Sequence, residues 1–156
     1  MTQLAVYMAL VDGAERALAD SFRVVAQAQA SHPDIYFTCQ ALATMSDDHR
    51  SRLGPVVARY GEQSESPGSE PERLHAEAMA TARTGPVGLL RDLQELHLLA
   101  NLVLTSWTVI QQAAKGLRDE ELVEVASYSS GETSRQLAWL TTRMKSVAPQ
   151  ALIVAS

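Results

Sequence analysis

The sequence has few of the residues that most often mark redox, zinc or nucleotide chemistry. It contains 1 cysteine, Cys39, so no internal disulfide can form and the chain fits a reducing compartment. It has no Cys-x-x-Cys pair, no His-Glu-x-x-His run and no Gly-rich phosphate loop ending in Lys-Ser/Thr. Cys39 falls on an apolar helical stripe, and we interpret it as an inert buried thiol.

Basic patches and long apolar runs are scarce as well. The 13 Lys and Arg residues are scattered and outnumbered by 18 Asp and Glu residues, for a net charge of −5, so we expect no nucleic-acid partner. No uninterrupted apolar run approaches the ~18 residues of a membrane span. The first residues lack the basic start of a signal peptide. These features predict a cytoplasmic protein with no membrane partner.

The sequence does contain strong helical periodicity in four long segments. Apolar residues recur at steps of three and four, the period of an amphipathic helix, and no strand-like alternation competes with it. We expect helices over about residues 4–29, 34–60, 87–115 and 119–148. Gly54-Pro55 lies inside the second segment, where we expect a kink or a local break.

The connections between these segments predict an up-down bundle with one long crossover. The short turns "SHPD" and "GLRDEE" force antiparallel neighbours, whereas residues 61–86 can cross the whole bundle. The crossover begins as a polar loop, and its later part, "EPERLHAEAMATART", predicts a short extra helix. We therefore expect a single all-α four-helix-bundle domain over residues 1–156.

The third segment is apolar on nearly every face, which predicts a burial surface beyond the bundle core. The apolar residues outside its main stripe are Leu98, Leu99, Leu102, Leu104 and Val109. We expect homo-oligomerisation through this helix, or a cover provided by the crossover. Lys115 and Gly116 predict its C-terminal cap. The apolar tail "PQALIVAS" is a second candidate surface, either for the bundle itself or for a protein partner.

Polar residues interrupt the apolar stripes near the middle of each segment. They are Glu15, His49, His97, Asn101, Ser130, Glu132 and Thr133. Burying a polar group without a partner costs roughly 2–7 kcal/mol on transfer scales, so a buried polar layer needs a structural or chemical reason. Facing helices of four-helix bundles build metal and cofactor sites at this depth.

The polar layer supplies only part of a di-iron ligand set. Di-iron carboxylate bundles take a Glu from each of two helices and a Glu-x-x-His pair from each of the other two. Here Ser46 stands three residues before His49, and Arg135 stands three residues after Glu132. Asn101 takes the central position of the third segment. A guanidinium in place of a histidine also opposes a dicationic centre.

The chain nevertheless resembles the ferritin-like superfamily, especially the small bacterial stress-associated proteins of the DUF892 kind. The similar stretches are "DDHRSRL", "AAKGLRDEELVEVA" and "SGETSRQLAWL", set in two helical pairs around a long crossover. The resemblance implies a di-iron site for iron oxidation, oxygen chemistry or peroxide scavenging. By position, the matching ligands are Glu15, His49 and Glu132.

The interpretation we favour is a degenerate di-iron site that has become a metal-free hydrogen-bond network. Glu15 and His49, together with Asn101, Ser130 and Thr133, would satisfy one another and fix the register of the helices. This predicts a bundle without catalytic residues or cofactor that serves as a structural, assembly or binding subunit.

Two alternatives remain open. In the first, Glu15, His49, His97 and either Glu132 or Asp48 hold iron or manganese, in a metal-binding oxidoreductase or stress protein. In the second, the polar layer lines a small-molecule pocket.

Overall fold

The computed structural model describes residues 3–61 and 76–154 as a bundle of four long helices. The helices are α1 (Gln3–Ala28), α2 (Pro33–Gly61), α3 (Gly85–Leu117) and α4 (Glu120–Pro149), with a π-helical turn, η1 (Gln150–Val154), at the end. The prediction of an all-α protein with four long helices is confirmed. Over the described ranges, no helix is long and apolar enough to cross a membrane.

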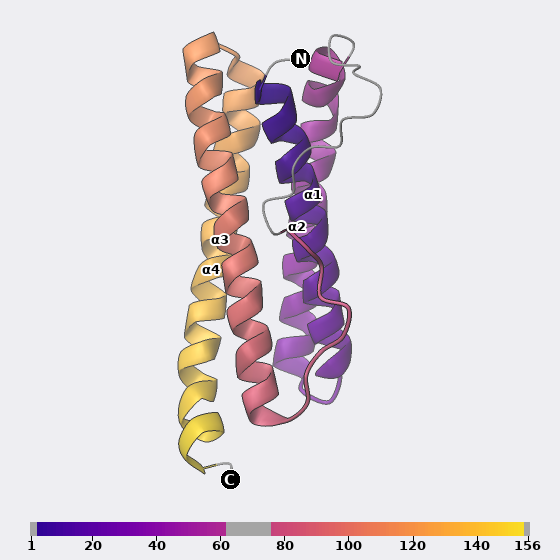
Figure 1. Ribbon diagram of the computed structural model, residues 1–156, viewed down its shortest axis with the longest axis vertical. Coiled ribbons are helices and arrows are strands. Elements are labelled where there is room, and N and C mark those ends of the chain that lie inside the picture. The colour runs from indigo at the N-terminus through magenta and orange to yellow at the C-terminus, as the bar shows by residue number, and fades with distance from the viewer. Residues whose placement is uncertain (1–2, 62–75, 155–156) are drawn as a thin grey trace.

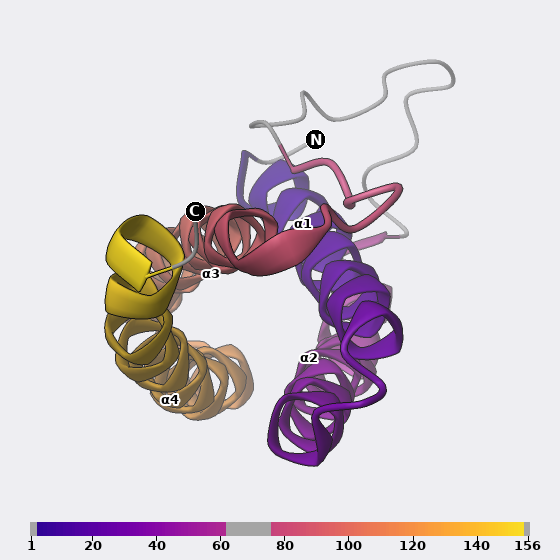
Figure 2. The same cartoon turned by 90° about the horizontal axis from the view of Figure 1, so that it is seen from below.

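The four helices run nearly along the long axis of the molecule and enclose the core in the order α2, α1, α3, α4 (Figures 1 and 2). The sequential pairs α1–α2 and α3–α4 pack most extensively, and α1 joins the two pairs by packing on α3. The contact between α2 and α4 is the smallest of the four. The bundle therefore consists of two helical hairpins joined mainly along one side.

The core is filled by the apolar stripe of each helix, as the periodicity predicts. The largest fully buried side chains include Trp107, Phe22, Met8, Leu18, Leu93, Leu96 and Leu140. Cys39 is also fully buried, and burial raises the pKa of its thiol to about 12, the charge of Arg143 opposing the shift. Its thiolate is therefore scarce at neutral pH, and Cys39 is an unreactive core residue.

We expected a kink or a local break at Gly54-Pro55; helix α2 continues through Pro55, so there is no break. Proline removes the hydrogen bond that the carbonyl four residues earlier would accept, here that of Ser51. Ser51 and Pro55 are both exposed, and a Cβ added at Gly54 would meet nothing within 4 Å. Water can therefore replace the lost hydrogen bond on this outer face, and the helix persists.

The end of the crossover is not helical. Residues 76–84 run as irregular chain, which corrects the prediction of a short helix there; the first part of that predicted helix lies outside the described residues. Side chains bind the backbone of this stretch. Ser21 Oγ accepts the Met79 N–H at 3.0 Å, and Asp92 Oδ2 accepts the Arg83 N–H at 2.9 Å. The backbone of this segment therefore forms hydrogen bonds with side chains of α1 and α3 in place of the internal hydrogen bonds of a helix.

Candidate functional site

A buried histidine lies between two glutamates inside the bundle. His49 on α2 has Nδ1 2.5 Å from Oε2 of Glu15 on α1, and Nε2 2.8 Å from Oε1 of Glu132 on α4. The side chains of His49 and Glu15 are 0% exposed, and that of Glu132 is 15% exposed. We call these three residues the triad. It ties together three helices, including α2 and α4, the neighbouring pair with the smallest contact.

The geometry of the triad favours the protonated form of His49. A neutral imidazole has one N–H donor and one acceptor nitrogen, whereas the imidazolium donates from both and satisfies a carboxylate on each side. Burial by itself lowers the pKa of His49. The hydrogen bonds and negative charges of Glu15 and Glu132 outweigh burial and raise the pKa above its usual 6.5. The proton on His49 therefore supplies the positive charge that the two carboxylates require.

Glu15 receives a second donor from α3. The indole Nε1–H of Trp107, itself fully buried, donates to Oε2 of Glu15 at 3.1 Å. The other carboxylate oxygen, Oε1, is buried and has no hydrogen-bond partner among the described residues. Helix α3 thus joins the network through an aromatic donor, and one acceptor of Glu15 stays open.

A second polar bridge between α4 and α2 lies one helical turn from the triad. The amide Nε2 of Gln136 donates to the Leu42 carbonyl at 2.9 Å and to Ser46 Oγ at 3.0 Å. Both Gln136 and Ser46 are fully buried. Ser46 occupies the position where a di-iron bundle would have a carboxylate, and here its hydroxyl serves as an acceptor for α4.

The structure places the other predicted polar residues at varying depths. Thr133 is buried and donates to the carbonyl of Ser129 at 2.7 Å, while Ser130 is half-buried and its Oγ has no partner in the described part of the chain. Asn101 is exposed, so the prediction that it lies in the inner layer is wrong. His97 is half-buried and contacts Asn101 at 3.1 Å and Thr141 at 3.3 Å. The structure brings Glu15, His49 and Glu132 together and leaves His97 and Asn101 outside.

The donors present do not fit a dinuclear metal centre. Both ring nitrogens of His49 face carboxylates, and Asp48 points to Arg52, whose Nε lies 2.8 Å from its carboxylate. Arg135 is exposed rather than directed at the triad. Within the residues that the structure describes, no cluster of three or more His, Cys, Asp or Glu side chains is arranged to hold a metal ion. The open Oε1 of Glu15, by contrast, favours an ion.

Two members of the network, Trp107 and Gln136, were not among the predicted site residues. Trp107 falls on the apolar stripe of its helix, a position where packing is the usual role of a tryptophan. Gln136 follows Glu132 by four residues and therefore lies on the same helical face. That spacing is the signal that could have identified Gln136 from the sequence.

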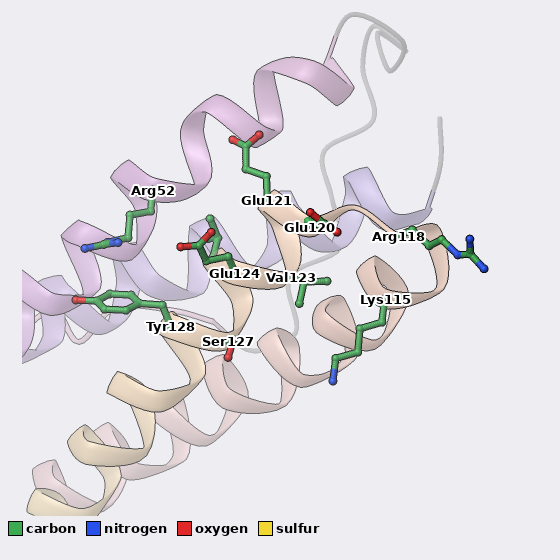
Figure 3. Close-up of a pocket in the computed structure, with 10 residues that line it drawn as sticks. Arg52, Lys115, Arg118, Glu120, Glu121, Val123, Glu124, Ser127 and Tyr128 are labelled. Carbon is green, nitrogen blue, oxygen red and sulfur yellow. The ribbon is translucent and has the colours of Figure 1, made fainter.

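Polar contacts also join α2 to α4 on both sides of the triad. Arg143 Nη2 lies 2.8 Å from Asp34 near one end, and Arg59 Nη2 lies 3.1 Å from Asp119 near the other. Figure 3 shows a surface hollow at the second end, where Arg52 of α2 lies across from Tyr128 of α4, with 3.9 Å from the guanidinium carbon to the ring centre. The hollow carries charges of both signs, and none of the triad residues lines it.

Comparison with known proteins gives no relative from which a function could be transferred. No protein-family model matches this chain, and neither a curated protein nor a solved structure is significantly similar to it. The ferritin-like resemblance therefore stays a hypothesis drawn from the sequence. Any functional argument has to start from the triad and the surfaces around it.

Proposed function

We propose that this chain is a metal-free, ferritin-like helical bundle that serves as a structural, assembly or binding subunit. The observation that carries the proposal is the occupation of both ring nitrogens of His49 by carboxylates from two other helices. In this proposal the imidazolium takes the place that a metal cation has in a di-iron carboxylate bundle.

Charge balance supports this proposal. A buried carboxylate is costly unless it is paired and hydrogen-bonded. Glu15 is fully buried, and it gains both the positive charge of His49 and the indole donor of Trp107. Glu132 completes the pairing while keeping some contact with solvent. A dication would instead compete with the His49 proton, since metal binding needs a neutral imidazole.

An assembly role is supported by apolar side chains on the outside of the bundle. Leu98 and Val109 on α3 are 70% and 50% exposed, and we propose that α3 mediates homo-oligomerisation. Leu152, Ile153 and Val154 in the terminal turn are 65%, 81% and 65% exposed, whereas Ala151 packs inward. This terminal turn is a second candidate surface, for a different protein partner.

The second candidate function is a metal-binding oxidoreductase or stress protein using iron or manganese. The unpartnered Oε1 of Glu15 favours it, because a cation would satisfy that buried acceptor. Such an ion would be held by Glu15 and Glu132, and by His49 only after loss of its proton. Three protein donors would suit one ion with water as a further ligand.

Metal analysis separates the two functions. The protein is expressed with added iron or manganese, purified without chelator, and analysed for metal per chain beside the variants His49→Ala and His97→Ala. Our proposal predicts far less than one ion per chain in all three proteins. About one ion per chain in the wild type and in His97→Ala, lost in His49→Ala, would establish the metalloprotein instead.

A further inference from the structure

The outward face of α3 carries no formal charge over several turns. Between Glu95 and Lys115 the helix has no Asp, Glu, Lys or Arg. The exposed residues of this stretch are Leu98, Asn101, Thr105, Thr108, Val109, Gln112 and Ala113. Interface cores are depleted in charged residues, whereas the solvent-facing side of a helix normally carries them. The absence of charge here indicates a surface that another helix covers.

The hydroxyl groups on this face make it more apolar than its composition indicates. Thr105 Oγ1 donates to the Leu102 carbonyl at 3.0 Å, and Thr108 Oγ1 donates to the Leu104 carbonyl at 2.8 Å. Each hydroxyl donor is therefore satisfied within its own helix. A helix packed here would not leave these donors unsatisfied.

The spacing of the central residues is symmetric. Leu98, Leu102, Thr105 and Val109 follow one another at steps of four, three and four, the 3–4 spacing of helices that pack side by side. We call these four residues the α3 stripe. Because its steps are the same in both directions, the stripe can pair with an antiparallel copy of itself about a two-fold axis.

We propose that the α3 stripe docks antiparallel on the α3 stripe of a second copy of this chain. In this arrangement Leu98 faces Val109 of the second copy, and Leu102 faces Thr105 of the second copy. Each layer then pairs a leucine with a smaller β-branched residue, which fills the layer evenly. A two-fold axis repeats both contacts, as an isologous interface requires.

The charges that flank the stripe suit the antiparallel direction. Glu95 precedes the stripe and Lys115 follows it, with side chains that are both accessible. Antiparallel pairing brings Lys115 of each copy to within about one helical turn of Glu95 of the other, measured along the helix axis. Glu95 also pairs with Arg83 of its own chain, at 2.5 Å. Parallel pairing would instead place Glu95 beside Glu95 of the second copy, and Lys115 beside Lys115.

The test introduces charged side chains into the α3 stripe and measures dimerisation by sedimentation velocity over a concentration series. The wild type is expected to dimerise reversibly. Leu98→Glu and Val109→Lys should each weaken dimerisation by at least about tenfold, because each buries an unpaired charge. The double variant L98E/V109K should recover dimerisation, since every introduced carboxylate then faces an introduced ammonium on the other copy.

Matched controls make the outcome specific. Phe37→Glu changes another exposed apolar residue, 68% exposed on α2, and should leave the dimer unchanged. The double variant L98E/V109E should stay monomeric. A monomeric wild type, or a failure of L98E/V109K to recover, overturns the proposal, and circular dichroism checks that each variant is folded. The proposal rests on the assembly role proposed above, but the metal content of the protein does not affect this readout.

Discussion

At the scale of single residues, the side chain of His49 links three helices through a single positive charge. Its imidazole pairs with Glu15 and Glu132, and Trp107 of α3 donates a hydrogen bond to Glu15. A buried ion pair adds little net stability compared with a well-packed apolar pair, but breaking it on one side is costly. The triad is thus better understood as a device that sets the register of the helices than as a source of stability.

This dependence predicts strong coupling between Glu15 and His49. His49→Leu alone should lower the free energy of unfolding by about 3–5 kcal/mol, because it leaves the buried carboxyl group of Glu15 without its ion-pair partner. The double variant E15L/H49L should lose much less than the sum of the two single changes. Urea unfolding of the four proteins measures this coupling. His97→Ala, outside the triad, should change stability by less than about 0.5 kcal/mol, and additive losses at positions 15 and 49 would contradict the coupling.

The sequence located Glu15 and His49 for a simple reason: each interrupts a stripe of buried apolar residues. It misplaced Asn101, which follows the buried Ala100 but is exposed. Positions on the flank of a stripe turn inward or outward according to how neighbouring helices cross, and this is a tertiary property that helical periodicity does not contain. The same limit explains why His97 remained a candidate from sequence alone.

At the scale of the elements, the end of α3 shows how a local pattern can be overruled. Gly116 was the predicted cap residue, yet it lies inside the helix, and Arg118 is the residue in the left-handed conformation, at φ 56°. The Arg118 N–H bonds to the Lys115 carbonyl, and Asp119 starts α4 by accepting the Leu122 N–H. The position of Asp119 as the α4 cap fixes where the turn must lie.

A glycine at the left-handed position should stabilise the protein. The left-handed conformation costs a residue with a Cβ roughly 1–2 kcal/mol, and the greater freedom of glycine in the unfolded chain offsets part of the gain. Arg118→Gly should therefore raise the free energy of unfolding by about 0.5–1 kcal/mol. Thermal and urea unfolding measure the change. Ala41→Gly, at an exposed right-handed position of α2, should instead lose about 1 kcal/mol, and a loss for Arg118→Gly would refute the argument.

At the scale of the whole molecule, the raised pKa of His49 links stability to pH. Its usual pKa is 6.5, and the triad raises the pKa in the folded protein. The folded state therefore binds the His49 proton more tightly than the unfolded chain does. The resulting stabilisation is complete below about pH 6.5 and is lost as the pH rises through the folded pKa.

The expected result is a bundle that becomes less stable from near-neutral to alkaline pH. Urea unfolding at a series of pH values above 6.5 measures the slope. The variant E15L/H49L lacks the titrating group, so its stability should fall less over the same range. Equal slopes for the two proteins would show that the proton on His49 does not contribute to stability.

Fold class and helix number followed from the sequence because long amphipathic periodicity is a strong local signal. The crossover was harder, since its composition favours helix while Ser21 and Asp92 bind its backbone in irregular form. Ser21 belongs to α1, which is far from the crossover in sequence, and Asp92 belongs to α3. Local propensity gives way here to tertiary hydrogen bonds.

The polar side chains between α2 and α4 determine how this side of the bundle, which we call the α2–α4 wall, responds to salt. Its ends are joined by ion pairs that each have one exposed partner, Asp34 with Arg143 and Arg59 with Asp119, and its middle by the buried His49. Dissolved ions screen exposed pairs within a Debye length of about 8 Å at physiological ionic strength, but they screen buried pairs far less. Added salt should therefore weaken the ion pairs at the two ends of the α2–α4 wall, while the buried pairing of His49 in the middle stays nearly unchanged.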